Sequence, residues 1–409
     1  MADGQSFGVD SQPLPEGGWS EDIVTVNNAI IVPPTESSFV QAAGVLDGAG
    51  GYCAQGALWR RYRPLTTEPP MPDGVSETLP GRWLWGGVLW AHFGHFLVES
   101  TARLWALDHL DAPVDGILFI PKRPAVGDEL RGFHSEFVGL IASDLPVRVA
   151  ASPVQVEELV VPGQGFGLGK IVTGTASFRN AIHKCFAQDI APDGPEKIYI
   201  SRSALGLGKG GLLGEEKLEE LLREEGYEIF FPEQHDLATQ IARYKAAKQI
   251  VAADGSALHL FAMVGRADQP VAMILRRQSG AADQLAQNVS SFCGRDPVVI
   301  SALRTEWVRQ NKQKSNRLSF GELDLNAIGK ALGEAGFVQQ GLDWPVLSKS
   351  ERQKLFWQKG LGKNSNFVES PEFKRKRIKE MRLARRAKRA EKEAAATGGP
   401  AKQTRVDQG

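Results

Sequence analysis

The second half of the chain alternates short apolar segments with longer amphipathic ones, and this alternation restricts its possible folds more than any other feature. Four apolar segments have the length of strands, at 197–202, 227–232, 249–254 and 270–275. Three segments with helical spacing separate them, at 215–226, 237–248 and 255–264. Strand segments that are apolar throughout are typical of a parallel sheet covered on both faces. The pattern therefore predicts an α/β domain.

The first half of the chain shows a less regular alternation. Strands are predicted at 23–26, 29–34, 56–64, 116–121 and 157–163, and helices at 92–110 and 129–142. A Pro- and Gly-rich stretch at 188–197 separates the two halves, and a further helix is predicted at 320–337. We therefore predict two successive α/β domains, with these boundaries: a flexible N-terminus over 1–20, a first domain over 21–190, a second over 191–345 and a C-terminal extension over 346–409.

The composition is that of an ordinary globular protein, with 42% hydrophobic and 23% charged residues. We expect no signal peptide, and no apolar run approaches the roughly 18 residues that span a bilayer. The three cysteines, Cys53, Cys185 and Cys293, lie far apart, which argues against a disulfide framework or a zinc ribbon. We therefore expect a cytoplasmic protein.

The charge is distributed unevenly along the chain. Residues 371–409 contain 13 Lys or Arg and 5 Asp or Glu, a net charge of +8, and the rest of the chain carries −8 because the whole is neutral. The composition of this tail favours a helix without an apolar stripe, or disorder. The tail could bind an anionic membrane surface and hold the protein at the inner face of a membrane, or remain a solvated extension. We expect no nucleic-acid partner.

Two histidines and a glutamate stand in an otherwise apolar stretch, GGVLWAHFGHFLVES at 86–100. His92 and His95 are three residues apart, and Glu99 is four beyond His95, so on a helix they share one arc with Arg103. Side chains at i and i+4 meet on a helix, so Glu99 can orient His95, and imidazole as a group titrates near neutral pH. This arrangement predicts a general base at His95.

Two other interpretations of this stretch compete with the general base. A metal site would need a third ligand at a recognised spacing, and no compact set of His, Cys or Asp residues follows. Alternatively, the histidines are hydrogen-bonded polar groups on a half-buried helix. Gly86 and Gly87 indicate a loop that enters the helix near His92.

A glycine-rich segment, GLGKGG at 206–211, matches the letters of the dinucleotide-binding fingerprint. In that fingerprint the first glycine stands directly at the strand end, so that the turn presents the pyrophosphate to the helix N-terminus. Here four residues, 202–205, intervene before the first glycine. A flexible loop is therefore favoured, and an NAD(P)-dependent oxidoreductase remains an alternative.

Three stretches in this order resemble glycosyltransferase family 61: GHFLVESTAR at 94–103, IYISRS at 198–203, and GEEKLEELLREEGYEIFFPEQHDLATQIARYKAAKQIVAADGSALHLF at 214–261. The resemblance covers roughly 92–263 and is strongest from Lys197 onward. It implies a GT-B-like fold, in which two Rossmann-like domains face a cleft. It also implies an inverting, metal-independent transfer of a sugar from a nucleotide-sugar donor, in bacteria often for surface polysaccharides.

The resemblance assigns roles to individual residues of this sequence. It implies that His95 is the catalytic base and that Glu99 is its partner. The residues expected to bind the donor are Arg202, Asp254, Gly255, Ser256, Ala257 and His259. The residues expected to support the site are Arg103, Glu215 and Gln240. It implies no cofactor and no metal. The partners would be a nucleotide-sugar donor and a glycan or lipid-linked acceptor.

The sequence departs from the family pattern at two places. Many members have His just before the glycine of the closing turn, where this chain has Asp254, and many have Asn-Glu where it has Gly214-Glu215. These departures keep open a catalytically inactive, glycosyltransferase-like binding or assembly protein.

Overall fold

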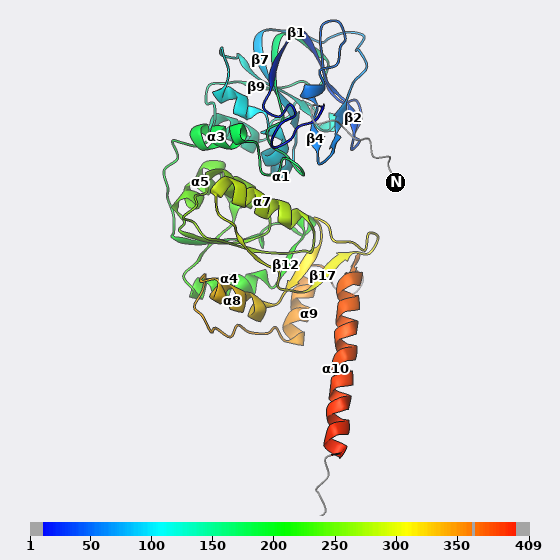
Figure 1. Cartoon of the computed structure of the whole chain (residues 1–409), viewed down its shortest axis with the longest axis vertical. Helices are drawn as coiled ribbons and strands as arrows, with labels where there is room; N and C mark the ends of the chain where they lie inside the picture. Colours follow the sequence, from blue (N-terminus) through cyan, green and yellow to red (C-terminus); the bar gives the residue numbers. More distant parts are fainter. Residues whose placement is uncertain (1–10, 362–364, 398–409) are drawn as a thin grey trace, which may run out of the picture.

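The computed structural model describes residues 11–361 and 365–397. Its first unit is built on a six-stranded mixed sheet (Figure 1). The strand order is β3 (Gly44–Leu46), β1 (Ile23–Val32), β10 (Val154–Pro162), β7 (Thr78–Leu89), β8 (Gly116–Pro121) and β9 (Val147–Val149). Strands β10, β7, β8 and β9 are parallel, whereas β1 is antiparallel to both of its neighbours. The first unit is therefore not an all-parallel sheet.

Short elements surround this sheet. Two small ribbons pair β2 (Gln41–Ala42) with β6 (Thr66–Thr67) and β4 (Trp59–Arg60) with β5 (Arg63–Pro64). The helices are α1 (Phe93–His95), α2 (Gly132–Gly139) and α3 (Ala176–Cys185), with 3-10 turns at 54–56, 104–108 and 124–126. The segment before β1 carries Trp19, which is buried and packs edge-on against Trp59 at 6.3 Å between ring centres. The flexible N-terminus predicted over 1–20 falls partly on residues 1–10, outside the described part.

The second unit contains a five-stranded sheet in which all neighbouring strands are parallel. Its order is β13 (Glu228–Phe230), β11 (Lys197–Ile200), β14 (Gln249–Ala253), β15 (Val271–Ile274) and β16 (Val298–Ile300). Numbered along the chain this is the order 2-1-3-4-5, in which ligands bind at the switch point between strands 1 and 3. The switch point here lies between β11 and β14.

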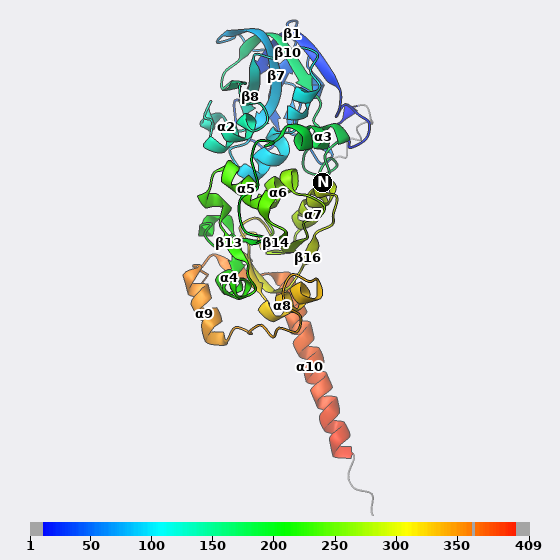
Figure 2. The ribbon, with the colours of Figure 1, turned by 90° about the vertical axis from the view of Figure 1, so that its left-hand side faces the viewer.

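Helices cover both faces of the second sheet, as the apolar strands predict. One face carries α5 (Leu237–Ala246), α6 (Ala257–Val264) and α7 (Ala281–Cys293), and the other carries α4 (Glu215–Glu224) and α8 (Leu325–Glu334) (Figure 2). Alternate residues of β11 follow this division, since Ile198 and Ile200 join the first apolar cluster and Tyr199 joins the second.

One apolar cluster spans both units, and each unit has a further cluster of its own. This cluster contains Phe166 and Phe178 of the first unit together with Phe292 of α7, whose ring centre lies 5.3 Å and 6.0 Å from the two. The contact between the two units is polar at the start of α5, where Leu237 N donates to Glu136 Oε2 at 2.9 Å. Helices α5, α6 and α7 therefore lie between the two large sheets.

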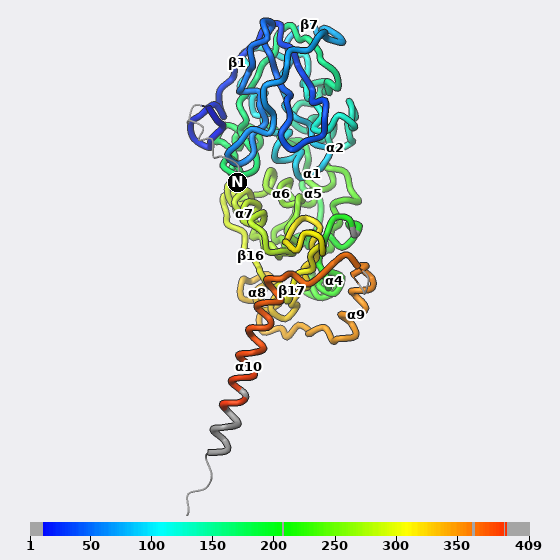
Figure 3. Tube along the Cα trace, turned by 90° about the vertical axis from the view of Figure 1, so that its right-hand side faces the viewer, coloured from blue at the N-terminus to red at the C-terminus, as the bar shows by residue number. Residues whose placement is uncertain are grey.

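A small mixed sheet and two helices complete the chain. The sheet contains β12 (Gly211–Leu213), β18 (Phe320–Leu323), β17 (Leu303–Arg309) and β19 (Phe367–Glu369), and the helices are α9 (Lys349–Gln358) and α10 (Pro371–Thr397). Helix α10 begins against β17, where Ser370 N donates to Glu306 O, and then projects away from the body (Figure 3). Among the described residues, no helix is both long and apolar enough to cross a membrane.

The mixed α/β class predicted from the sequence is confirmed, and several predicted elements match closely. The strand predicted at 116–121 is β8, and each strand and helix predicted between 197 and 275 is present within a few residues. A pair of Rossmann-like domains in a GT-B arrangement is not confirmed. The predicted tail helix is present to Thr397, and residues 398–409 lie outside the described part.

Three local predictions were wrong. Gly86 and Gly87 do not form a loop: they lie in a bulge within β7, where Gly87 has φ +90° and a Cβ on Gly86 would lie 2.4 Å from the Phe119 ring. The predicted helix at 320–337 begins with strand β18. The segment 92–110 is not one helix, because α1 passes into a π-turn at 96–100 and breaks before a 3-10 turn at 104–108.

Candidate active site

Polar side chains interrupt the helix that was predicted at 92–110. Ser100 Oγ donates to Val88 O at 2.8 Å and accepts from Trp90 N at 3.0 Å, and Thr101 Oγ1 donates to Leu97 O at 2.7 Å. Side chains that bond to nearby backbone compete with the helical pattern. The result is a π-turn over Phe96–Ser100, a feature that frequently occurs at functional sites.

This turn brings His95 and Glu99 into contact, as their spacing predicts. His95 Nδ1 lies 3.1 Å from Glu99 Oε2. Arg60 of β4 donates to the same carboxylate from Nε and Nη2, both at 2.6 Å, and its Nη2 lies 3.2 Å from His95 Nδ1. The Glu99 side chain is fully buried, whereas 32% of the His95 side chain is exposed. His95 therefore reaches solvent while its carboxylate partner is sealed beneath it.

The surroundings keep Glu99 ionised. Burial raises the pKa of Glu99, but the hydrogen bonds from His95 and Arg60 and the charge of Arg60 outweigh burial, so the net pKa is lowered. An ionised carboxylate accepts the Nδ1–H of His95, which leaves Nε2 with a free lone pair. The Trp90 ring stacks on His95, with ring centres 4.6 Å apart, and fixes the plane of the imidazole.

His92 lies beside this pair without joining it. Its ring centre is 5.4 Å from that of His95. Loss of hydration, followed by the charges of His95, Lys209 and Arg317, lowers the pKa of His92 to about 4. The latter two residues belong to the second unit, so His92 faces positive charge across the junction between the units.

The second unit contributes Arg202, which follows β11, and the turn after β14. A Cβ added at Gly255 would lie 2.6 Å from Arg202 Nη1, so the guanidinium packs directly on this glycine. Arg202 Nε is buried and has no hydrogen-bond partner in the described part of the chain. Burial, followed by the charge of Arg276, lowers the pKa of Arg202 to about 10. The switch point of the parallel sheet therefore holds a cation with unused donors.

Asp254 belongs to a buried ion pair. Its Oδ1 lies 3.0 Å from Arg276 Nε and accepts from Arg276 N at 3.2 Å, and both side chains are nearly inaccessible. Burial raises the pKa of Asp254, and the positive charges of Arg276, Arg277 and Arg202 oppose this shift. Asp254 therefore joins the ends of β14 and β15 and anchors Arg276.

The two groups of residues meet where α1 touches α6. A Cβ on Gly94, the residue before His95, would lie 3.0 Å from the Cβ of Ser256. Ser256 precedes Ala257, the first residue of α6, and the amide groups at a helix N-terminus lack acceptors within the helix. Gly94, the neighbour of the base, thus lies next to the turn against which Arg202 and Arg276, here called the arginine cluster, pack.

A family model described as Glycosyltransferase 61 matches residues 93–267. Residues 93–267, called the family 61 domain below, are therefore similar to glycosyltransferase family 61. The match runs from α1 through the β14–α6 turn, and so contains both His95 and Arg202. A search of curated proteins found no match to the chain. The family indicates glycosyltransferase activity, which requires a sugar donor and an acceptor.

Two of the predicted supporting residues of the family 61 domain, Arg103 and Gln240, have structural partners away from the base. Arg103 is buried and donates to the carbonyl groups of Gln55 and Ala57 at 2.9 Å and 2.8 Å and to that of Pro162. Gln240 Nε2 donates to Pro232 O and His235 O, both at 2.9 Å. Both side chains therefore hold loops in place and lie apart from the His95–Glu99 contact.

Glu215 and His259 are closer to the site. Glu215 Oε1 accepts from Arg202 N at 2.8 Å and from Tyr199 Oη at 3.0 Å, and burial raises its pKa to about 7. Glu215 therefore fixes the backbone that presents Arg202. His259 Nδ1 lies 2.8 Å from Asn288 Oδ1, and burial lowers its pKa to about 4, so it is neutral at physiological pH.

Sequence reasoning missed the arginines that complete the site. Arg60 is 39 residues from Glu99, and only the local run of three arginines around it was a signal. Arg276 and Arg277 follow β15 after one intervening residue, at the same sheet edge as Arg202. This position at the carboxyl end of a parallel strand could have identified them.

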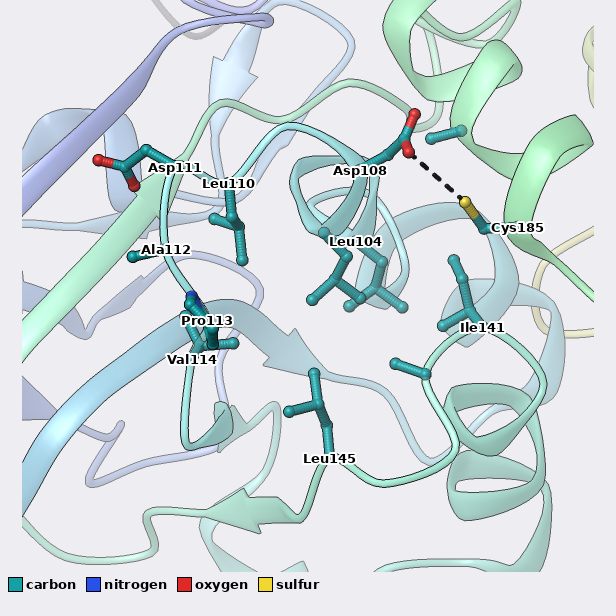
Figure 4. A pocket seen from close by; sticks show the side chains of 13 residues that line it. Leu104, Asp108, Leu110, Asp111, Ala112, Pro113, Val114, Ile141, Leu145 and Cys185 are labelled. Atoms are coloured by element: carbon teal, nitrogen blue, oxygen red, sulfur yellow. Dashed lines mark hydrogen bonds between the residues drawn. The ribbon is translucent and has the colours of Figure 1, made fainter.

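Other features of the family 61 domain lie apart from this site. A cavity of about 440 Å³ is lined largely by apolar residues with Asp108 and Cys185, which contact each other at 3.8 Å, and none of the predicted site residues lines it (Figure 4). The segment 206–211 leads into strand β12 before α4 begins, unlike a dinucleotide-binding turn. In the described part of the chain, no three His, Cys, Asp or Glu side chains gather as metal ligands.

Proposed function

We propose that the chain is an inverting, metal-independent glycosyltransferase that moves a sugar from a nucleotide-sugar to a hydroxyl group of a glycan or lipid-linked acceptor. The observation that carries this proposal is the close approach of Gly94 to Ser256, which sets the His95–Glu99 pair against the arginine cluster. A base and a diphosphate-binding site on opposite sides of a sugar are what direct displacement with inversion requires.

The proposed mechanism assigns the acceptor to His95. Its Nε2 takes the proton of the acceptor hydroxyl as the oxygen attacks the anomeric carbon. Ionised Glu99 accepts from Nδ1–H and stabilises the imidazolium that forms, and Arg60 keeps that carboxylate in place. The bond between the anomeric carbon and the diphosphate oxygen breaks at the same time, and the nucleoside diphosphate leaves with its negative charge.

The leaving group would be held by the second unit. Arg202 has a buried Nε without a hydrogen-bond partner among the described residues, and guanidinium groups bind phosphate with two parallel hydrogen bonds. The N-terminus of α6, with Gly255, Ser256 and Ala257, favours negative charge through its unpaired amides. Asp254 contributes indirectly, because it anchors Arg276 beside Arg202.

We expect Arg202→Ala to weaken nucleotide-sugar binding by about 1.5–3 kcal/mol, the range for hydrogen bonds to charged groups. The fold should persist, since the Arg202 side chain forms no hydrogen bond within the described residues. Calorimetric titration with a panel of nucleotide-sugars measures the effect. Arg243→Ala, which removes a second-unit arginine paired with Asp193, is the matched control. Unchanged donor affinity in Arg202→Ala would contradict the assignment.

The same titrations separate the alternatives to a transferase. An inactive binding or assembly protein would bind neither nucleotide-sugars nor dinucleotides. An NAD(P)-dependent oxidoreductase would bind dinucleotides and no nucleotide-sugar.

The proposal includes attachment to an anionic membrane surface in the cytoplasm through residues 371–409. The Lys and Arg side chains of α10 at 374–377 are exposed, as are those at 379, 382, 385 and 386. Phe373, by contrast, is buried, and Arg377 pairs with Glu369 at 2.7 Å. The first turns of α10 therefore belong to the body, and the projecting part is the membrane-binding candidate.

We expect truncation after Arg377 to reduce binding to vesicles that contain phosphatidylglycerol by at least tenfold at low salt. The removed residues 378–409 contain nine Lys or Arg and four Asp or Glu, and each basic residue near an anionic bilayer contributes roughly 1 kcal/mol. Cosedimentation measures this binding, with phosphatidylcholine vesicles as the neutral control. Equal cosedimentation of the full and truncated chains would rule out this role of the tail.

A further inference from the structure

An exposed aromatic side chain lies beside the His95–Glu99 pair. Phe39 belongs to the segment between β1 and β2 and is 49% exposed. Arg60, which holds Glu99, also lies over the Phe39 ring, with its Cζ 5.7 Å from the ring centre. Arg63 lies over the same ring at 4.9 Å. One guanidinium therefore connects the exposed ring to the proposed catalytic pair.

A buried lysine fixes the segment that carries Phe39. Lys122 Nζ donates to Ser38 O at 3.1 Å, to Phe39 O at 3.0 Å and to Gln41 Oε1, and only 6% of the residue is exposed. Burial, followed by the charge of Arg60, lowers the pKa of Lys122 to about 8. The exposed ring is thus held in position before any ligand arrives, which reduces the entropy lost on binding.

The neighbouring hairpin adds positive charge that no carboxylate among the described residues neutralises. Arg61 and Arg63 are exposed, and neither forms an ion pair within the described residues. The hairpin is anchored, because Arg61 N donates to Leu168 O at 2.8 Å and Arg61 has φ +61°, a strained value for a residue with a side chain. A ligand for this surface needs an apolar face for Phe39 and a negative group for the arginines.

We propose that Phe39 and Arg63 form an acceptor subsite for an acidic glycan. This inference rests on the proposed function, in which the acceptor approaches His95. Phe39 contacts the apolar face of a sugar ring, and Arg63 binds the carboxylate of that ring through its guanidinium. The contact of Arg60 with both Phe39 and Glu99 places the subsite next to the base, so an acceptor bound there presents a hydroxyl to His95.

The test measures binding of fluorescently labelled hexagalacturonate to the full chain by anisotropy. Its methyl ester, which keeps the rings but lacks the charges, is the matched probe. We expect the ester to bind at least about tenfold more weakly, and Phe39→Ala and Arg63→Gln each to weaken binding of the acid about tenfold. Trp357→Ala and Arg382→Gln, which change an exposed aromatic and an exposed arginine elsewhere, should bind like the wild type.

Three results would overturn the subsite: equal binding of acid and ester, wild-type affinity in Phe39→Ala, or equal loss in the two control variants. Nucleotide-sugar titration of Phe39→Ala provides a further check, since a lost donor affinity would assign the ring to the donor instead. The binding assay contains no donor, so its result is independent of catalysis. Glycan binding without any nucleotide-sugar binding would reject the proposed function while leaving the subsite in place.

Discussion

Replacement of His95 by alanine should lower turnover by on the order of 10²–10⁴-fold, the usual contribution of a general base, while donor affinity stays near that of the wild type. The reason is geometric. The buried carboxylate of Glu99 accepts from Nδ1 at 3.1 Å, so the proton of the acceptor hydroxyl is taken at Nε2. Steady-state transfer assays with the donor found by titration measure turnover, and calorimetry measures affinity.

His92 supplies the matched control for this experiment. It is a histidine of the same segment with its ring 5.4 Å from His95, and its pKa of about 4 makes it neutral in the assay. We expect His92→Ala to cost much less turnover than His95→Ala, and a chelator to have no effect on either protein. Full turnover in His95→Ala would contradict the role of His95 as the base. Loss of turnover on chelation that zinc or manganese restores would instead establish a metal-dependent mechanism.

Replacement of Arg60 by methionine should lower the free energy of unfolding by about 3–5 kcal/mol, the effect of removing one partner of a buried ion pair. Glu99 is fully buried and would lose two hydrogen bonds of 2.6 Å, so its charge would have only His95 as a partner. Methionine keeps the length and apolar stem of the side chain. Urea unfolding at neutral pH, followed by fluorescence, measures the change.

The pH dependence of this loss identifies its cause. In the wild type the pKa of Glu99 is lowered from its ordinary value of 4.5, so the ion pair stabilises the fold above pH 4.5 and this stabilisation is lost as the pH falls. Without Arg60 the pKa of Glu99 rises, so the deficit of the variant should be largest near pH 7 and shrink toward acid pH. The double variant Arg60→Met, Glu99→Gln should recover most of the stability at pH 7. A deficit that is independent of pH and remains in the double variant would indicate lost packing rather than an uncompensated charge.

The parallel sheet of the second unit could be predicted from the sequence because its signals are local. Each strand between 197 and 275 is apolar throughout, and each helix between them has its own spacing and turn residues. The contact between His95 and Glu99 was predictable for the same reason, since four residues along one helical turn fix it. A π-turn at Phe96–Ser100 preserved that contact even though the continuous helix was wrong.

The rest of the site depends on contacts between distant segments. Arg60 meets Glu99 only because β4 lies beside the turn that follows β7, and no spacing along the chain encodes that contact. Asp254 was predicted to bind the donor and was noted as a departure from the family pattern, whereas its partner Arg276 becomes evident only once β14 and β15 are adjacent. The mixed sheet of the first unit could not be predicted either. The antiparallel direction of β1 depends on its pairing with β10 and β3, which are distant segments, and not on its local sequence pattern.

The apolar cluster that joins the two units also limits how the molecule can move. A hinge rotation about the connection at 186–196 would expose Phe178 and Phe292 to water, at a cost of roughly 25 cal/mol for each Å² of apolar surface. A rotation that uncovers several hundred Å² would therefore cost many times the thermal energy. We expect substrates to enter and products to leave through displacements of surface loops such as 201–210, on faster timescales than those of domain motion.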